Sequence, residues 1–197
     1  ISIDKCLYLS EEAKRVLEAS SQPPIKLVTV GGGDSKLEAG NETVMFRHEE
    51  KFHHPCGLGF IIEDNLDDSQ IKQKLEKINQ LKFERVGQIL NVNLIAVRQN
   101  KDANRFTQAV KLVLDNSSLG LVLMSDDLEA QTKALEISKT KRPLLYHATQ
   151  ENAAEFSKLA RDFNVPLVVS ASDLEGLSAL TKELNNQGVG DLVLDTG

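Results

Sequence analysis

GLVLMSDDLEAQTKALEISKTKRPLLYHA, residues 120–148, contains the pattern that decides the fold. The short apolar run Leu121–Met124 is followed by Ser-Asp-Asp and by a segment whose apolar residues have helical spacing. A second apolar run, Leu144–Tyr146, ends in His147. Short, continuously apolar runs on either side of a helix are typical of buried parallel strands. We therefore predict a strand, a helix and a second strand, which together make one βαβ unit.

The same unit recurs along most of the chain. Each predicted strand is apolar, ends in polar residues and is followed by a helix with one apolar stripe. The predicted strands are Leu58–Ile62, Val92–Val97, Leu121–Met124, Leu144–Tyr146, Leu167–Val169 and Leu192–Leu194. The helix residues expected in the core include Ile71, Leu75, Phe106, Leu128, Leu135, Ile137, Phe156, Leu174 and Leu177.

Strict alternation of strands and helices predicts an α/β fold, either a (β/α) barrel or a doubly wound sheet. Nothing in the sequence marks a reversal of strand order or a dinucleotide fingerprint, so we favour a TIM-type barrel. A full barrel has eight strands and typically about 250 residues. Only about six strands fit into these 197 residues. We therefore expect a barrel that is incomplete at its C-terminus, in a processed or truncated chain that does not begin with Met.

The chain is expected to divide into an N-terminal helix with a linker, then a β-hairpin at the barrel entrance, then the partial barrel: residues 1–24, 25–56 and 57–197. The strands of the hairpin are predicted at Ile25–Val30 and Thr43–Phe46, because both runs are rich in β-branched residues. The three glycines that follow Val30 are interpreted as a turn. A phosphate-binding loop would need a helix N-terminus behind it.

Composition limits the function classes. A net charge of −6 is unfavourable for a nucleic-acid binder, which usually carries a basic face. No apolar run approaches the roughly 20 residues of a membrane helix. The two cysteines cannot form a disulfide framework, and no signal peptide is evident, so a reducing cytoplasm is expected. Since tryptophan is absent and aromatic residues make up 5%, the core must be aliphatic.

In a βα barrel, functional residues lie at the carboxyl ends of the strands. No partner carboxylate for His147 is identifiable by spacing, so no catalytic residue is assigned. Asp126, Thr149 and Asp173 can also be explained as helix caps. The polar residues that follow the strands, and that could bind a small polar ligand, are Glu63, Asp64, Arg98, Gln99, Ser125, Asp126, His147, Thr149, Ser170, Ser172 and Asp195.

A histidine-rich stretch, RHEEKFHHPC at residues 47–56, contains side chains that zinc accepts. It has neither a second cysteine pair nor an HExxH pattern, and adjacent His53 and His54 would point in opposite directions in an extended chain. We expect a polar edge beside the hairpin at this position, with no metal.

Longer phrases of the sequence resemble the large (gamma) subunit of the corrinoid iron–sulfur proteins of the acetyl-CoA (Wood–Ljungdahl) pathway, also called the acetyl-CoA decarbonylase/synthase gamma subunit. They run in order over essentially the whole chain, which makes the resemblance more specific than a single motif. The phrases are DKCLYLSEEAKRVLEASSQPPI (4–25), GNETVMFRHEEKFHHP (40–55), RVGQ (85–88), LIAVR (94–98), LVLMSDD (121–127), RPLLYHATQEN (142–152) and LVLDTG (192–197).

The resemblance implies a three-part protein: a small domain with a four-iron four-sulfur (4Fe-4S) cluster, a central βα barrel, and a domain that binds the corrinoid (cobamide). Cys6 matches the last cysteine of the family's cluster motif, so it is a metal ligand only if the upstream cysteines exist in a longer native chain. The corrinoid domain would follow Gly197. The family ends this region with Asp-Pro-Gly where this chain has Asp195-Thr196-Gly197, and Cys56 has no counterpart there.

The resemblance also implies a function. Such a carrier takes a methyl group from methyltetrahydrofolate or a related pterin and delivers it to acetyl-CoA synthase. The expected partners are the small (delta) subunit, the pterin methyltransferase and acetyl-CoA synthase, without nucleic acid or membrane, and the barrel is expected to be a non-catalytic scaffold that binds no cofactor itself. The alternative is a methyltransferase barrel whose Gln99, Asp126 and Asn152 hydrogen-bond a pterin.

Overall fold

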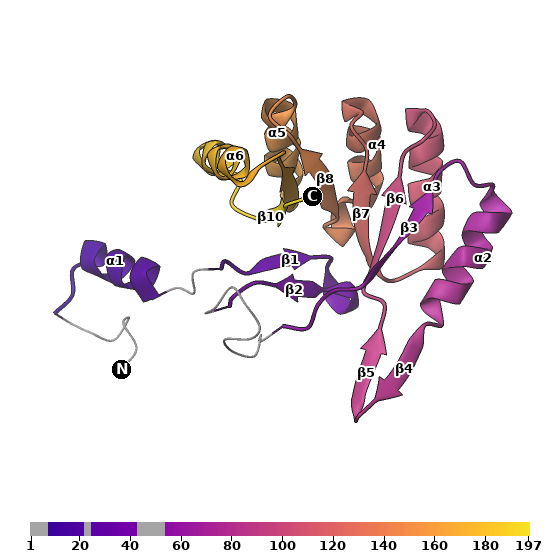
Figure 1. The fold of residues 1–197 in the computed structure, drawn as a ribbon, viewed down its shortest axis with the longest axis horizontal. Coiled ribbons are helices and arrows are strands. Elements are labelled where there is room, and N and C mark those ends of the chain that lie inside the picture. The colour runs from indigo at the N-terminus through magenta and orange to yellow at the C-terminus, as the bar shows by residue number, and fades with distance from the viewer. Residues whose placement is uncertain (1–7, 22–24, 43–53) are drawn as a thin grey trace.

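A computed structural model describes residues 8–21, 25–42 and 54–197. Its main feature is a sheet of six strands, all parallel, in the order β10-β9-β8-β7-β6-β3 (Figure 1). The strands of this sheet are β3 (Gly59–Glu63), β6 (Leu94–Arg98), β7 (Gly120–Met124), β8 (Leu144–Ala148), β9 (Leu167–Ser170) and β10 (Leu192–Asp195).

A helix follows each of the first five strands of this sheet, and aspartates begin most of these helices. The side chains of Asp67, Asp102, Asp127 and Asp173 accept hydrogen bonds from backbone amides of the first turn, which would otherwise be unpaired. The helices are α2 (Asp68–Asn79), α3 (Ala103–Asn116), α4 (Leu128–Ser138) with the 3-10 turn η3 (Lys139–Lys141), α5 (Ala153–Phe163) and α6 (Leu174–Asn186); α1 (Glu11–Ser21) comes earlier in the chain.

The strands of the main sheet lie side by side in the order in which the chain makes them. Crossovers between parallel strands are right-handed, so a sheet built in one direction places all its helices on one face. Figure 1 shows α2 to α6 ranged along the same side of the strands. The α/β prediction is confirmed at this level, and the missing reversal of strand order argues against the doubly wound alternative.

Two apolar layers cover the two faces of the sheet. On the helix side, alternate strand residues such as Ile95, Leu123 and Leu167 are buried against the helices. On the opposite face, Val122, Leu144 and Val168 pack with Val30 from the N-terminal hairpin. Side chains of a strand alternate between faces, so this second layer shows that the sheet is buried on both sides.

The N-terminal hairpin differs from its prediction. Strand β1 (Val28–Val30) pairs antiparallel with β2 (Leu37–Ala39), and the 3-10 turn η2 (Gly33–Ser35) joins them. The predicted second strand, Thr43–Phe46, lies outside the described residues. The turn is tight because Gly31 and Gly33 adopt positive φ angles, +85° and +57°, which glycine adopts without steric cost.

Charged groups fasten this hairpin to the amino end of the sheet. Arg142 donates from its guanidinium to the carbonyl of Thr29, and its own carbonyl accepts from the amide of Gly31 at 3.0 Å. Its Nη2 lies 2.5 Å from a carboxylate oxygen of Asp191, and Lys26 Nζ lies 2.9 Å from the other oxygen. Three segments far apart in sequence therefore meet at one carboxylate.

A second hairpin, β4 (Lys82–Arg85) with β5 (Gln88–Asn91), occupies the connection between α2 and β6. It was not predicted: the expected strand Val92–Val97 begins at Leu94 instead, and the chain before it turns back on itself. The turn has Val86 and Gly87 at φ angles of +51° and +71°. Valine at such a position carries no turn signal, because Asn or Asp before Gly is the usual pattern there.

Three residues expected in the core are exposed. Leu128, Ile137 and Leu174 keep 39%, 43% and 72% of their surface accessible. Leu128 and Leu174 open the first turns of their helices, where the apolar stripe has not yet begun. The buried stripe of α4 instead runs through Ala130, Gln131, Ala134, Leu135 and Ser138.

Asp191 should make stability depend on acidity. Burial alone raises the pKa of Asp191, but hydrogen bonds and charge from Lys26 and Arg142 outweigh it and hold the pKa below its usual 3.8. A lowered pKa means that the contribution is complete above about pH 5 and is lost as the pH falls below 4. We predict that Asp191→Asn lowers the melting temperature at pH 7, and that the gap to the native protein closes toward pH 3. A gap that stays constant over this range would contradict the network.

Gly31 should be hard to replace. An added Cβ would lie 2.4 Å from the Ser35 carbonyl oxygen, in a backbone conformation with φ +85°. We predict that Gly31→Ala lowers the free energy of unfolding by about 1–3 kcal/mol, measured by urea denaturation. Gly32→Ala is the matched control, because Gly32 is extended at φ −147° and its Cβ would meet only the Thr140 oxygen at 3.5 Å. Equal losses in the two variants would refute this account of the turn.

Candidate functional site

The carboxyl ends of the strands bring several predicted residues together. In the register of the sheet, Glu63 lies beside Arg98, Arg98 beside Met124, and Met124 beside Tyr146. At the other end, Asp195 lies beside Ser170. These side chains belong to the face opposite the helices, so they form a polar row above the apolar layer of that face.

Three contacts organise the row. Arg98 Nη1 lies 3.9 Å from Glu63 Oε1, and both side chains are 43% exposed, so this is a loose surface pair. His147 Nδ1 lies 3.9 Å from Asp126 Oδ1, which is too far for a direct hydrogen bond. The hydroxyl of Tyr146 donates to Asp195 Oδ2 at 2.8 Å, which is a well-formed hydrogen bond.

The Tyr146–Asp195 contact shifts both groups in the directions expected for such a pair. The hydrogen bond to Asp195, with burial and the negative charge of the carboxylate, raises the pKa of Tyr146 above its usual 10.0. The amide of Gly197 and the Tyr146 hydroxyl hold the pKa of Asp195 below its usual 3.8. A carboxylate of lowered pKa is a weak base, so this pair is poorly suited to moving protons near neutral pH.

A hollow of about 400 Å³ opens between the ends of β6, β7 and β8. Within it, the buried Nδ1 of His147 has no hydrogen-bond partner among the described residues. The residues lining it are Arg98, Gln99, Met124, Ser125, Asp126, Asp127, Tyr146 and His147. A second hollow, of about 570 Å³, is lined by Thr149, Ser170, Ser172 and neighbours from α6. Eight of the predicted strand-end residues are therefore divided between two openings, and Glu63, Asp64 and Asp195 line neither of them.

Several of the predicted residues are engaged in holding loops. Asp64 is fully buried, and its carboxylate accepts the amides of Asn100 at 2.7 Å and Lys101 at 3.2 Å. Gln99 accepts from the hydroxyl of Ser125 and donates to the carbonyl of Lys101 at 3.0 Å. Buried polar groups with their hydrogen bonds satisfied within the fold have little capacity left for a ligand.

The structure revises the helix caps. Asp173 caps α6 as expected, through a 2.7 Å hydrogen bond from the Gly176 amide. Asp127, not Asp126, caps α4. Thr149 is not the cap of α5. Asp126 is left with 83% of its side chain exposed beside the hollow, which makes it the most available acidic group there.

Gln131 is a buried polar residue that the pattern of apolar residues did not predict. It is fully buried on α4, and its amide nitrogen donates to the carbonyls of Leu123, Ser125 and Tyr146 at 2.8–3.2 Å. Its side-chain carbonyl oxygen has no hydrogen-bond partner in the part of the chain that the structure places. The only signal in the sequence is a glutamine at a stripe position of a helix. It ties the ends of β7 and β8 together beneath the hollow.

The histidine-rich stretch lies mostly outside the described residues, as does Cys6. Of its described members, His54 donates its amide to Glu42 at 3.1 Å, and Cys56 is a free, exposed thiol. Among the residues that the structure places, no group of three or more His, Cys, Asp or Glu side chains could hold a metal ion. In that same part of the chain, no helix is long and apolar enough to cross a bilayer.

The chain is similar to known proteins over most or all of its length. The family described as "CO dehydrogenase/acetyl-CoA synthase delta subunit" matches residues 27–197. The "Corrinoid/iron-sulfur protein large subunit" of Moorella thermoacetica is 39% identical over 197 residues, which are 100% of this chain and 44% of that protein. An "Acetyl-CoA decarbonylase/synthase complex subunit gamma" of Methanopyrus kandleri is 34% identical over 196 residues, 98% of this chain and 42% of that protein.

The fold defines the class of protein: an α/β protein with a singly wound parallel sheet and a polar row at its strand ends. Within this class, the chain belongs to the CO dehydrogenase/acetyl-CoA synthase delta subunit family, and its relatives carry the names of corrinoid iron–sulfur protein large subunits or acetyl-CoA decarbonylase/synthase gamma subunits. The resemblance noted in the sequence is confirmed. The chain spans less than half the length of these relatives, from 38% to 44%.

The Tyr146–Asp195 hydrogen bond can be tested by titration. A raised tyrosine pKa means that the contribution of the bond is complete below about pH 10 and is lost as the pH rises through the folded-state value. We predict that Tyr146 titrates at lower pH in Asp195→Asn, followed by NMR of labelled tyrosine ring carbons. An unchanged Tyr146 titration would show that the bond does not form in solution.

Proposed function

We propose that this chain is a non-catalytic scaffold region of a corrinoid iron–sulfur methyl carrier. In the whole protein, the carrier takes a methyl group from methyltetrahydrofolate or a related pterin and delivers it to acetyl-CoA synthase. The observation that carries this proposal is the 39% identity over the full chain to a corrinoid/iron–sulfur protein large subunit. This role would place the protein in the cytoplasm.

The geometry of the strand ends supports a scaffold role. General acid–base catalysis needs a proton donor or acceptor within hydrogen-bonding reach of its partner. His147 and Asp126 are 3.9 Å apart, and Tyr146 is committed to Asp195. Among the residues that the structure describes, the strand-end face therefore has polar side chains but no pair arranged for proton transfer.

The alternative, a pterin-binding methyltransferase barrel, requires free hydrogen-bonding groups on Gln99, Asp126 and Asn152. Gln99 uses both ends of its amide on Ser125 and Lys101. Asn152 uses both ends as well, accepting from the Thr149 amide at 2.7 Å and donating to the His147 carbonyl at 3.3 Å. Only Asp126 remains available, and one carboxylate is too little to orient a pterin ring.

We further propose that the six strands form part of a TIM-type barrel, with β3 and β10 as the strands at which it is completed. Both edge strands keep large apolar side chains partly exposed, with Ile61 at 46% and Leu194 at 55% accessible. Exposed apolar edges of a parallel sheet are usually covered by further strands or by a partner. The proposed partners are the small (delta) subunit, the pterin methyltransferase and acetyl-CoA synthase.

The cofactors of such a carrier do not fit the described residues. A four-iron four-sulfur cluster needs four thiolates, and Cys56 is isolated. The hollow beside His147, about 400 Å³, suits a small ligand, whereas a corrinoid with its macrocycle and nucleotide tail is larger than a drug-sized molecule. We assign both cofactors to other parts of the full-length protein and derive no step through them.

Substitutions at the strand ends of the full-length protein test this proposal. We predict that Asp126→Asn and Tyr146→Phe each change the rate of methyl transfer from methyltetrahydrofolate to cobalt by less than about twofold, because neither group would take part in the chemistry. Loss of a general acid or base typically costs about 100-fold or more. The rate is measured by the visible absorbance change of the corrinoid, with the purified methyltransferase as catalyst.

The control is Lys158→Gln, on the exposed side of α5, which changes one charge away from the strand ends. A loss of 100-fold or more in Asp126→Asn, with correct folding and normal behaviour of the control, would contradict the scaffold role and favour catalysis on this face.

A further inference from the structure

The β4–β5 hairpin is an unusual insertion. Connections from a helix to the next strand in α/β units normally take 2–6 residues, whereas here the chain from Gln80 to Asn93 makes two additional strands. Within the described residues, these strands pair only with each other, as a sheet separate from the main one. Figure 1 shows the hairpin projecting from the amino end of the main sheet. A lone two-stranded hairpin is marginally stable in water.

The surface of this hairpin is apolar where it should be polar. Phe83 and Ile89 keep 59% and 60% of their area accessible, and Val86 at the tip keeps 95%. Val86 also adopts φ +51°, an unfavourable conformation for a β-branched residue. Asparagine would fit this turn at lower cost. Packing among the described residues explains neither the conformation nor the exposure of Val86.

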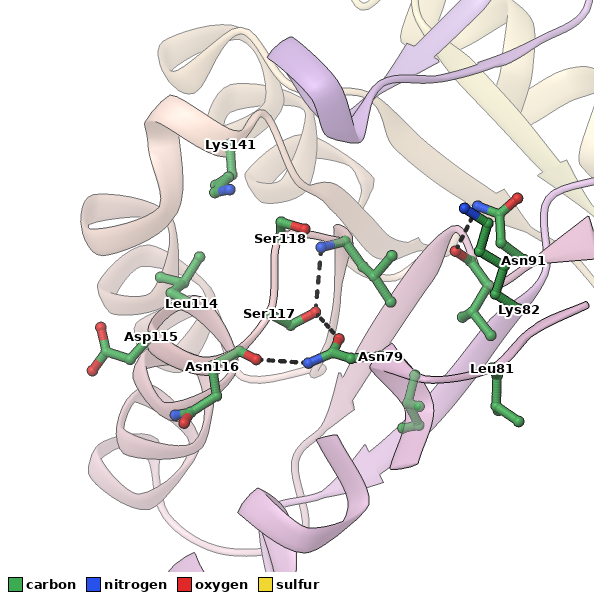
Figure 2. A pocket seen from close by; sticks show the side chains of 13 residues that line it. Asn79, Leu81, Lys82, Asn91, Leu114, Asp115, Asn116, Ser117, Ser118 and Lys141 are labelled. Atoms are coloured by element: carbon green, nitrogen blue, oxygen red, sulfur yellow. Dashed lines mark hydrogen bonds between the residues drawn. The ribbon is translucent and has the colours of Figure 1, made fainter. Parts of the chain in front are cut away.

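A hollow of about 650 Å³ lies at the base of the hairpin, beside the C-terminal ends of α2 and α3. Figure 2 shows Lys82 and Lys141 at opposite sides of it, with Asn79 between them. The floor is held in place by hydrogen bonds: Asn79 Nδ2 donates to the Asn116 carbonyl at 2.8 Å, and Ser117 Oγ donates to Asn79 Oδ1 at 2.7 Å. The hollow is therefore a fixed feature of the fold.

The charge of this hollow is opposite to that of the chain. Its lining carries Lys82 and Lys141 against the single acidic residue Asp115, in a chain of net charge −6. Neither lysine ammonium group has a hydrogen bond or ion pair with any residue in the described part of the chain, although Lys141 is half-buried. By contrast, the strand-end hollow near α6 is lined by Glu151, Asp173 and Glu183 without a basic residue.

We propose that the hairpin and this hollow form a docking surface for an acidic, extended segment of a partner protein. We call it the hairpin surface and define it by Lys82, Val86, Ile89 and Lys141. Glu84 lies opposite Ile89 on this face, whereas Phe83 pairs with Leu90 and lies on the other face of the hairpin. The ammonium groups would pair with carboxylates of the segment, and the apolar side chains would cover its apolar residues. A two-stranded sheet also offers unpaired backbone edges, which an extended chain can join as a further strand.

This proposal does not depend on the methyl-carrier role, because it rests on the geometry of the hairpin and on its charge. It accounts for the valine at the tip: a residue that is unfavourable in the free chain becomes favourable once a partner buries it. It also accounts for two lysine side chains, at one opening of an acidic chain, that have no partner among the described residues. Since the surface is small, binding in the micromolar to millimolar range is expected.

The test uses the full-length protein and a labelled peptide of about ten residues that alternates glutamate and valine. We expect saturable binding by fluorescence anisotropy, weaker at high salt because exposed charges are screened. A peptide that alternates lysine and valine should not bind. The combined Lys82→Glu and Lys141→Glu protein should bind the acidic peptide about tenfold more weakly, since each exposed pair contributes modestly.

Two further variants separate docking from folding. Val86→Asn should leave the melting temperature equal or higher, because it relieves the turn, yet it should weaken binding about threefold or more. Lys158→Glu, which makes one of the same charge changes on α5, should leave binding unchanged. Hydrogen exchange should slow at residues 82–91 when the acidic peptide is present.

The proposal is overturned if both peptides bind alike, if neither binds, or if the paired lysine substitutions leave binding unchanged. Protection that appears at the strand ends instead of residues 82–91 also overturns it. Binding of single-stranded RNA to these lysines, without binding of the acidic peptide, would assign the surface to a nucleic acid and reject a protein partner.

Discussion

The order of the parallel strands is the constraint on which the rest of the structure depends. Because each new strand of the main sheet is added on the same side of the one before it, every crossover runs in the same direction and places its helix on the same face. The other face is left with an apolar layer and a polar row at the strand ends. A single rule of chain connectivity thus separates the side that makes the core from the side that could meet a ligand.

The two ends of this second face have different roles. At the amino end, the Arg142–Asp191 pair, with Lys26, closes the face with the β1–β2 hairpin. At the carboxyl end, Tyr146 donates to Asp195, and Gln99 bonds to Ser125 and Lys101, so these groups are satisfied within the fold. The amino end of this face is covered by the hairpin, and polar groups at its carboxyl end are hydrogen-bonded within the fold. This arrangement fits a region that holds other parts of a protein in place.

Local patterns predicted the strands and helices well, because a short apolar run or an aspartate cap involves only residues that are close together in the sequence. Contacts between distant segments could not be read in the same way. The Tyr146–Asp195 hydrogen bond joins residues 49 apart, and nothing in their spacing marks it. The β4–β5 hairpin was missed because valine stands where turn residues usually do, and Gln131 was missed because a buried amide resembles an exposed one in the sequence. Leu174 was placed in the core because the predicted stripe was carried one turn too far. Family membership was evident from ordered phrases, which carry more information than periodicity.

The central claim is that the strand-end face is not a substrate site. Calorimetric titration of the full-length protein with methyltetrahydrofolate tests it most directly, because a pterin-binding barrel must bind its substrate at this face. The account predicts no saturable heat up to about 1 mM ligand, a limit that corresponds to roughly −4 kcal/mol of binding free energy. Micromolar binding that disappears in Asp126→Asn would contradict the account and place a pterin at the carboxyl ends of the strands.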